Sequence, residues 1–150
     1  MVKKTADRDY MDFTHSTIAY VNATNDIYVT IYPHEIADSK EDAFMMTIHG
    51  INQYLPHYNF IVPQGFTNFI SVTVLTNELN GFMLDGQSVT TKNVYTLSTE
   101  SGSYSSFSMP IRSGEHIIAH VNNTEFGLWV YGNARYDAYG YPAGIKFRTV

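Results

Sequence analysis

The sequence contains no cysteine. Disulfide bonds, thiolate metal sites and cysteine nucleophiles are therefore excluded. The compartment stays open on this evidence, because a chain of 150 residues can bury enough surface to fold without disulfides even outside the cell.

Positive charge and long apolar runs are also scarce. Nine Lys and Arg stand against 14 Asp and Glu, for a net charge of −5, and basic residues cluster only at Lys3-Lys4. We expect no nucleic-acid partner, because such a partner requires a basic patch. No run approaches the ~20 apolar residues of a membrane span, so we expect no membrane insertion. The start lacks the apolar core of a signal peptide. We interpret residues 1–8 as a disordered or artificially added N-terminus and residues 9–150 as a single domain.

The sequence also lacks the motifs of common enzymes, including G-x-S-x-G, the P-loop and H-E-x-x-H. On a strand, His116 and His120 would share a face about 13 Å apart, too far to hold one ion, and we interpret them as facing solvent. Glu115 and Glu125 could serve as the paired carboxylates of a glycosidase only if a cleft held them about 5 to 10 Å apart. Nothing in the sequence indicates such a cleft, and we predict that the protein is not an enzyme.

Aromatic and β-branched residues are abundant, with 12 Tyr and 9 Phe, a composition typical of strands. Apolar and polar residues alternate in four segments, which predicts half-buried antiparallel strands. The residues expected to face the core are Ile27, Val29 and Ile31; Ile70, Val72 and Val74; Ile117, Ala119 and Val121; and Phe126, Leu128 and Val130.

Turn signals separate these segments. Asp85-Gly86 predicts a type I′ hairpin, Asn80-Gly81, Ser101-Gly102 and Ser113-Gly114 mark further turns, and residues 122–125 read as a hairpin loop. Together the patterns predict an all-β fold, an antiparallel β-sandwich of jelly-roll type with about nine or ten strands.

The aromatic C-terminal segment is the candidate binding surface. Its rings would offer large, rigid contact area for a protein or a sugar. The predicted contact residues are Trp129, Tyr131, Tyr136, Tyr139 and Tyr141, with Asp137 capping a turn and Gly140 and Gly144 adopting positive φ. The alternative is that these tyrosines cover the end of the sandwich.

Two further kinds of site are predicted from side-chain chemistry. Asp38, Glu41 and Asp42 would supply oxygen ligands to calcium, although they do not match an EF-hand loop. A solvated loop is the alternative, and the calcium ion is the one cofactor that we consider. Asn22 and Asn122 begin N-x-T sequons in predicted loops, which favours a secreted glycoprotein.

The run FGLWVYGNARYDAYGYPAG, residues 126–144, resembles the end of the IgGFc-binding protein N-terminal domain family, with the motif Asp-Ala-Tyr-Gly-Tyr-Pro-Ala-Gly at residues 137–144. YNFIVPQGFTNFISVTV, FMLDGQSV and SGEHII resemble earlier family segments, so the resemblance spans about residues 16–144 and is strongest in the last third. It implies an extracellular β-sandwich module of large multidomain adhesive or mucus proteins. The family name refers to the Fc part of immunoglobulin G.

We therefore predict a non-enzymatic, extracellular or cell-surface adhesion or structural module that binds proteins or glycans within a larger protein. The alternative function is a calcium-dependent, lectin-like domain that binds carbohydrate. Homo-oligomerisation through exposed edge strands is a further option, because unpaired strand edges and aromatic patches both invite partners.

Overall fold

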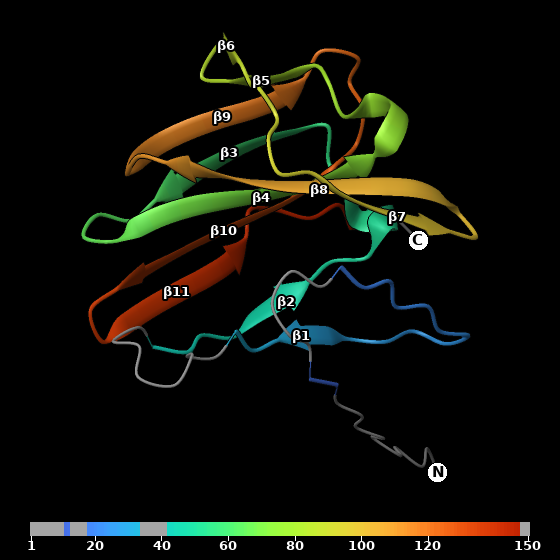
Figure 1. Cartoon of the computed structure of the whole chain (residues 1–150), viewed down its shortest axis with the longest axis horizontal. Helices are drawn as coiled ribbons and strands as arrows, with labels where there is room; N and C mark the ends of the chain where they lie inside the picture. The colour runs from blue at the N-terminus through green and yellow to red at the C-terminus, as the bar shows by residue number, and fades with distance from the viewer. Residues whose placement is uncertain (1–10, 13–17, 34–41, 148–150) are drawn as a thin grey trace.

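The computed structural model describes residues 11–12, 18–33 and 42–147, so the predicted N-terminal segment 1–8 lies outside the described residues. Within them, the strands β1 to β11 form three antiparallel sheets. Figure 1 shows a four-stranded sheet at the top, a five-stranded sheet across the middle and a two-stranded sheet below. No helix among these residues is long and apolar enough to cross a membrane.

The two larger sheets form the sandwich. The five-stranded sheet has the order β11 (Asp137–Pro142), β10 (Gly127–Ala134), β4 (Thr67–Leu75), β8 (Gly102–Ile111) and β7 (Tyr95–Thr99). The four-stranded sheet has the order β3 (His57–Val62), β9 (Gly114–His120), β5 (Phe82–Leu84) and β6 (Gln87–Ser88). The chain crosses between the sheets after β3, β4, β6, β8 and β9. This connectivity is of the jelly-roll type, and the predicted all-β sandwich is confirmed.

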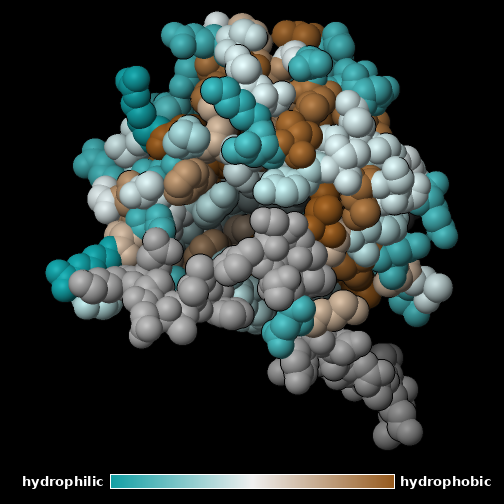
Figure 2. All heavy atoms as spheres, in the orientation of Figure 1, coloured by the Kyte–Doolittle hydropathy of each residue, from teal (hydrophilic) through white to brown (hydrophobic). Residues whose placement is uncertain are grey.

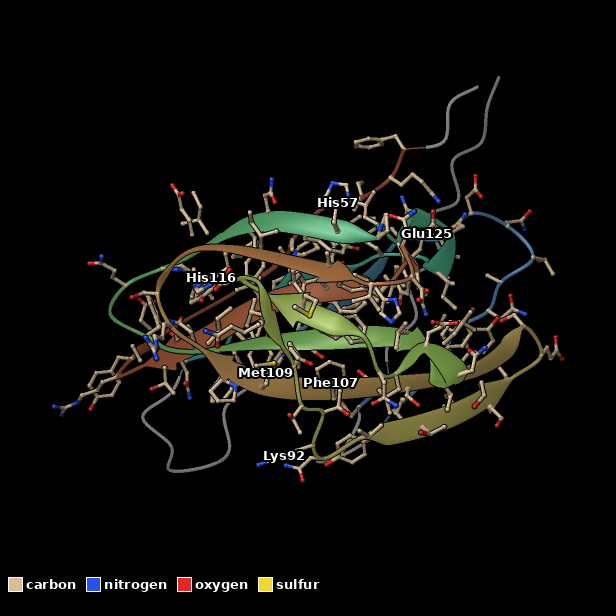
Figure 3. The ribbon with its side chains drawn as sticks, turned by 90° about the horizontal axis from the view of Figure 1, so that it is seen from above. His57, Lys92, Phe107, Met109, His116 and Glu125 are labelled. Carbon is tan, nitrogen blue, oxygen red and sulfur yellow. The ribbon has the colours of Figure 1, made fainter. Side chains whose placement is uncertain are left out.

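The core lies between these sheets and follows from the period-two pattern of the strands. Ile70, Val72 and Val74 of β4 are each 0% exposed, as predicted. Phe82 meets Phe107 and Phe126 edge-on, with ring centroids 5.6 and 4.9 Å apart. Each fully buried side chain of this size stabilises the fold by about 1.5–3 kcal/mol. Figure 3 labels Phe107 and Met109 of β8, whose side chains belong to this core region.

Strand β9 has the opposite orientation to our prediction. Ile118 is 0% exposed and His120 only 4%, whereas Ile117 is 56% and Val121 64% exposed. The strand carries apolar residues on both faces, so alternation alone does not select the inner one. Pairing with β3, which sets Tyr58 opposite Ile118 and Asn59 opposite Ile117, decides the register.

The connections between strands confirm one predicted turn and correct another. Asp85 and Gly86 join β5 to β6 with φ of 50° and 78°, as a type I′ turn requires. Residues 122–125 do not form a hairpin loop, because β9 pairs with β3 and β5 whereas β10 pairs with β4 and β11. This segment instead carries the chain from one sheet to the other.

The small sheet of β1 (Val29–Ile31) and β2 (Met46–Ile48) covers part of the outer face of the five-stranded sheet, and the 3-10 turn η1 (Ile51–Gln53) follows β2. It creates a second apolar cluster in which Met46 and Tyr54 bury Trp129. Tyr54 meets the Trp129 ring edge-on at 6.0 Å. Strand β10 is therefore buried on both faces over part of its length.

Candidate binding surfaces

The outer face of the four-stranded sheet carries an apolar stripe, defined here as Ile61, Met83, Ile117, Ala119 and Val121. Ile61 of β3 is 66% exposed, and Ile117 and Val121 are similarly open. Met83 stands opposite Ala119 in the β5–β9 ladder, so the stripe spans three neighbouring strands. Figure 2 shows apolar residues reaching the surface in the upper half of the molecule, which contains this sheet. Sequence reasoning missed the stripe because it placed Ile117, Ala119 and Val121 in the core.

Two histidines beneath the stripe hold β9 to its neighbours. Our prediction that they face solvent is wrong, because both side chains point into the sandwich. His116 Nδ1 lies 2.6 Å from Asp85 Oδ2, and its Nε2 donates to the carbonyl of Arg112 at 2.9 Å. The hydrogen bond from the Ile117 N–H, followed by the one from His116, lowers the pKa of Asp85. The His116 side chain therefore joins the β5–β6 turn to the β8–β9 turn (Figure 3).

His120 anchors the other end of the strand. Its Nε2 donates to the carbonyls of Glu78 and Asn80 at 3.0 and 2.9 Å, while Nδ1 accepts the Asn122 N–H at 3.3 Å. Both ring nitrogens are thus used internally, and the ring packs edge-on against Phe82. Among the described residues no group of three His, Asp or Glu side chains could hold a metal ion.

A second surface lies at one end of the sandwich, where three loops meet. Register places the β3–β4, β8–β9 and β10–β11 loops together, because Val62 pairs with Gly114, Asn68 with Ile111, and Thr67 with Asn133. These loops lie at the left of Figure 1. We call this surface the loop end.

The C-terminal hairpin forms part of the loop end. Ala134 pairs with Asp137, so Arg135 and Tyr136 make a two-residue loop. Tyr136 is 64% exposed, and the Arg135 guanidinium lies over its ring, 5.0 Å from the centroid. Asp137 is exposed as well. Of the predicted contact residues, Tyr136 and Asp137 are the two that the structure presents to solvent.

The other predicted contact residues are buried or half-buried. The Tyr139 hydroxyl donates to Asn68 Oδ1 at 2.6 Å, and the Tyr141 hydroxyl donates to the Ile61 carbonyl. Burial raises the pKa of Tyr139 to about 12 and also raises that of Tyr141. Tyr139 thus ties β11 to β4 within the five-stranded sheet, whereas Tyr141 ties β11 to β3 of the facing sheet, as the alternative interpretation proposed.

Trp129 and Tyr131 belong to the layer between the five-stranded and two-stranded sheets. Trp129, predicted to be part of an exposed patch, is only 6% exposed, and its Nε1 has no hydrogen-bond partner in the described part of the chain. Tyr131 is half-buried and stacks between Phe44 and Phe69, at 6.5 and 5.6 Å. Burial beneath the two-stranded sheet removes the Trp129 ring from the predicted binding surface.

The predicted roles of two glycines are wrong. Among the described residues neither Gly140 nor Gly144 has positive φ; Tyr136 does, with φ of 60°. Gly140 is required for a different reason: a Cβ there would lie 2.1 Å from Cε2 of Phe44. The glycine lets the Phe44 ring approach the backbone of β11.

The structure describes only some of the residues of the predicted calcium and glycan sites. Asp38 and Glu41 lie outside the described residues, and Asp42 Oδ1 accepts the Ala43 N–H at 2.8 Å. The calcium site stays a prediction. Asn22 is exposed, whereas Asn122 Nδ2 donates to Glu78 Oε2 at 3.1 Å in an exposed position. Glycosylation at either position also stays a prediction.

The two carboxylates considered for a glycosidase do not form a pair. Glu115 lies at the start of β9, next to the loop end, whereas Glu125 follows the far end of that strand. Glu125 instead forms an ion pair with Lys146. This arrangement provides no facing carboxylates for glycoside hydrolysis.

Comparison with known proteins identifies one family. Residues 2–132 match the family model described as IgGFc binding protein. No curated protein and no solved structure matches the chain. The matched range contains most of the chain but ends before the motif at residues 137–144. A family named for binding favours a binding module over an enzyme and agrees with the predicted extracellular location. The chain therefore belongs to the IgGFc binding protein family.

Proposed function

We propose that this chain is a non-enzymatic extracellular adhesion module that binds a β-sandwich domain of a partner protein through its apolar stripe. The observation that carries the proposal is the exposure of Ile61, Ile117 and Val121 on one sheet face. Apolar patches of a few hundred Å² on a protein surface are often functional. The family name supports a protein partner, and the Fc part of immunoglobulin G is itself built from β-sandwich domains.

The shape of the stripe favours a flat partner. A sheet face packs most closely on another sheet, with the two about 10 Å apart and their strands within about 30°. His57 and Asn59 of β3 lie on the same face, opposite Ala119 and Ile117, so a partner that covers the stripe must also contact these two polar side chains at its β3 edge. Glu115 stands opposite Ile61 at one end and supplies a charged rim.

The size of the stripe predicts modest affinity. From Glu115 to Val121 the chain extends about 20 Å, and three strands are about 14 Å wide, so the whole sheet face, polar residues included, covers about 300 Å². A standard interface buries about 800 Å² per partner. One module therefore binds weakly, and several copies in a larger secreted or surface protein would bind tightly through avidity.

The test is binding of the purified chain to the immobilised Fc fragment of immunoglobulin G, measured by biolayer interferometry. We expect Ile117→Lys to weaken binding at least tenfold, because the new charge would be buried without a partner. The matched control is Ile27→Lys. Ile27 was predicted to face the core, but it is 54% exposed and lies outside the sandwich strands. This control should bind like the wild type.

Two results would contradict the proposal. Equal binding by Ile117→Lys and wild type, with both folded by circular dichroism, would exclude the stripe as the contact surface. A wild-type chain that does not bind Fc would refute the assignment of Fc-type sandwich domains as partners. Sedimentation velocity of the wild type distinguishes self-association, in which a second copy occupies the stripe.

A further inference from the structure

Among the described residues with positive φ, Tyr136 alone is neither Gly, Asp nor Asn. Asp85, Asn93 and Asn123 also have positive φ, with values of 50°, 51° and 56°. Asp and Asn tolerate this region because their short side chains form local hydrogen bonds. An aromatic side chain gains nothing comparable there. Tyr136, with φ of 60°, occupies a position that favours Gly or Asn.

Packing within the fold does not explain why a tyrosine occupies this positive-φ position. Its side chain is 64% exposed, and the guanidinium of Arg135, the preceding residue, lies over its ring and donates to its hydroxyl at 3.5 Å. Tyr139 and Tyr141, three and five residues later, place their hydroxyls on Asn68 and Ile61 and so stabilise the fold. An unfavourable backbone conformation without a gain in packing points to a role other than stabilising the fold.

The residues around Tyr136 have the composition of a protein-binding surface. The loop end contains Gln64, Gly65 and Phe66 from the β3–β4 loop, Arg112 and Ser113 from the β8–β9 turn, and Gly114 at the start of β9. Tyr and Arg dominate the energetics of protein interfaces, while Ser and Gly adapt to the partner. Arg112 and Arg135 lie near Glu115 and Asp137, so the surface has no single sign of charge. This mixture suits a folded protein better than a polyanion.

We propose that Tyr136, braced by Arg135, is an anchor that inserts into a pocket on the partner protein at the loop end. The inference rests on the proposed protein-binding function and adds a second contact, carried by an observation independent of the apolar stripe. The tight hairpin holds the ring at the tip of β10 and β11. Little conformational freedom is therefore lost when the ring is buried by the partner.

The test replaces Tyr136 by Asn, which accepts positive φ and removes the ring. We expect Tyr136→Asn to raise Tm by about 2–4 °C, because the backbone strain is relieved. The same variant should bind the Fc fragment at least tenfold more weakly, the loss typical of an interface anchor. Stability and binding thus change in opposite directions, which a purely structural residue would not produce.

The control is Tyr95→Asn on strand β7, where Tyr95 is 47% exposed with ordinary φ. It should lower Tm, because Tyr suits a strand better than Asn, and leave Fc binding unchanged. A lower Tm for Tyr136→Asn would overturn the proposal by showing that the ring supports the fold. A higher Tm with unchanged binding would also overturn it.

The experiments distinguish a failure of the proposed stripe function from a failure of the Tyr136 anchor. Weaker binding by Tyr136→Asn together with full binding by Ile117→Lys would reject the stripe and retain the anchor. A wild-type chain that does not bind Fc would reject both proposals. The predicted rise in Tm of Tyr136→Asn is measured without a ligand. A lower Tm of this variant therefore rejects the anchor even when the wild-type chain binds Fc normally.

Discussion

The contact between Gly140 and Phe44 predicts a specific loss of stability. A Cβ at residue 140 would lie 2.1 Å from Cε2 and 2.5 Å from Cδ2 of Phe44. Both distances are far below van der Waals contact, so Gly140→Ala must displace the ring. Phe44 also stacks on Tyr131, and displacing it would loosen the two-stranded sheet from the sandwich.

The expected magnitude follows from the cost of overpacking. Inserting a methyl group into a filled site costs about 1–3 kcal/mol, and 1 kcal/mol corresponds to about 2–4 °C in Tm for a domain of this size. We therefore expect Gly140→Ala to lower Tm by about 2–12 °C. Gly144→Ala is the matched control, because its Cβ would lie 3.4 Å from the nearest atoms, of Leu55 and Tyr58. That change should be neutral or raise stability by about 0.4–1 kcal/mol.

The assay is thermal and urea unfolding, followed by circular dichroism and by the fluorescence of Trp129, the single tryptophan. Because Trp129 lies beneath the two-stranded sheet, its emission also reports whether that layer loosens before the sandwich unfolds. A double-mutant cycle with Phe44→Ala isolates the contact: Gly140→Ala should cost less once the ring is gone. Equal stabilities for Gly140→Ala and Gly144→Ala would refute the reasoning.

Two predictions concern pH. The pKa of Asp85 is lowered in the folded state, chiefly by the hydrogen bond from the Ile117 N–H. Its contribution is therefore present above the ordinary value of 3.8 and disappears as pH falls below it. Asp85→Asn should cost about 0.5 kcal/mol at pH 7 and less near pH 2.5, measured by urea unfolding; a pH-independent cost would contradict this. Burial raises the pKa of Tyr58 and Tyr139 to about 12, so both stay protonated when unfolded tyrosines ionise near 10. Stability should fall as pH rises above 10, and ultraviolet titration should show late-ionising tyrosines that Tyr139→Phe reduces in number; complete ionisation near pH 10 would oppose the assigned burial.

Composition predicted only part of the binding surface at the loop end. An exposed tyrosine within an aromatic segment was predictable, and Tyr136 is one. Which of the neighbouring rings are buried was not, because that depends on residues distant in the sequence: Asn68 and Ile61 engage Tyr139 and Tyr141, and Met46 and Tyr54 cover Trp129. An aromatic run by itself indicates a sheet end or a binding surface without choosing between them.

Local physics within the sequence determined the fold class and most of the turns of this protein. Alternation in β4 predicts its buried face, and Asp85-Gly86 predicts its hairpin, because side-chain direction and turn conformation depend on adjacent residues. Tertiary structure decided which face of β9 is buried. Ile117 and Ile118 are equally apolar, and the register with β3 placed one in the core and the other on the surface. A shift of one residue exchanges the two faces, so the apolar stripe exists only through strand pairing that the local pattern does not encode.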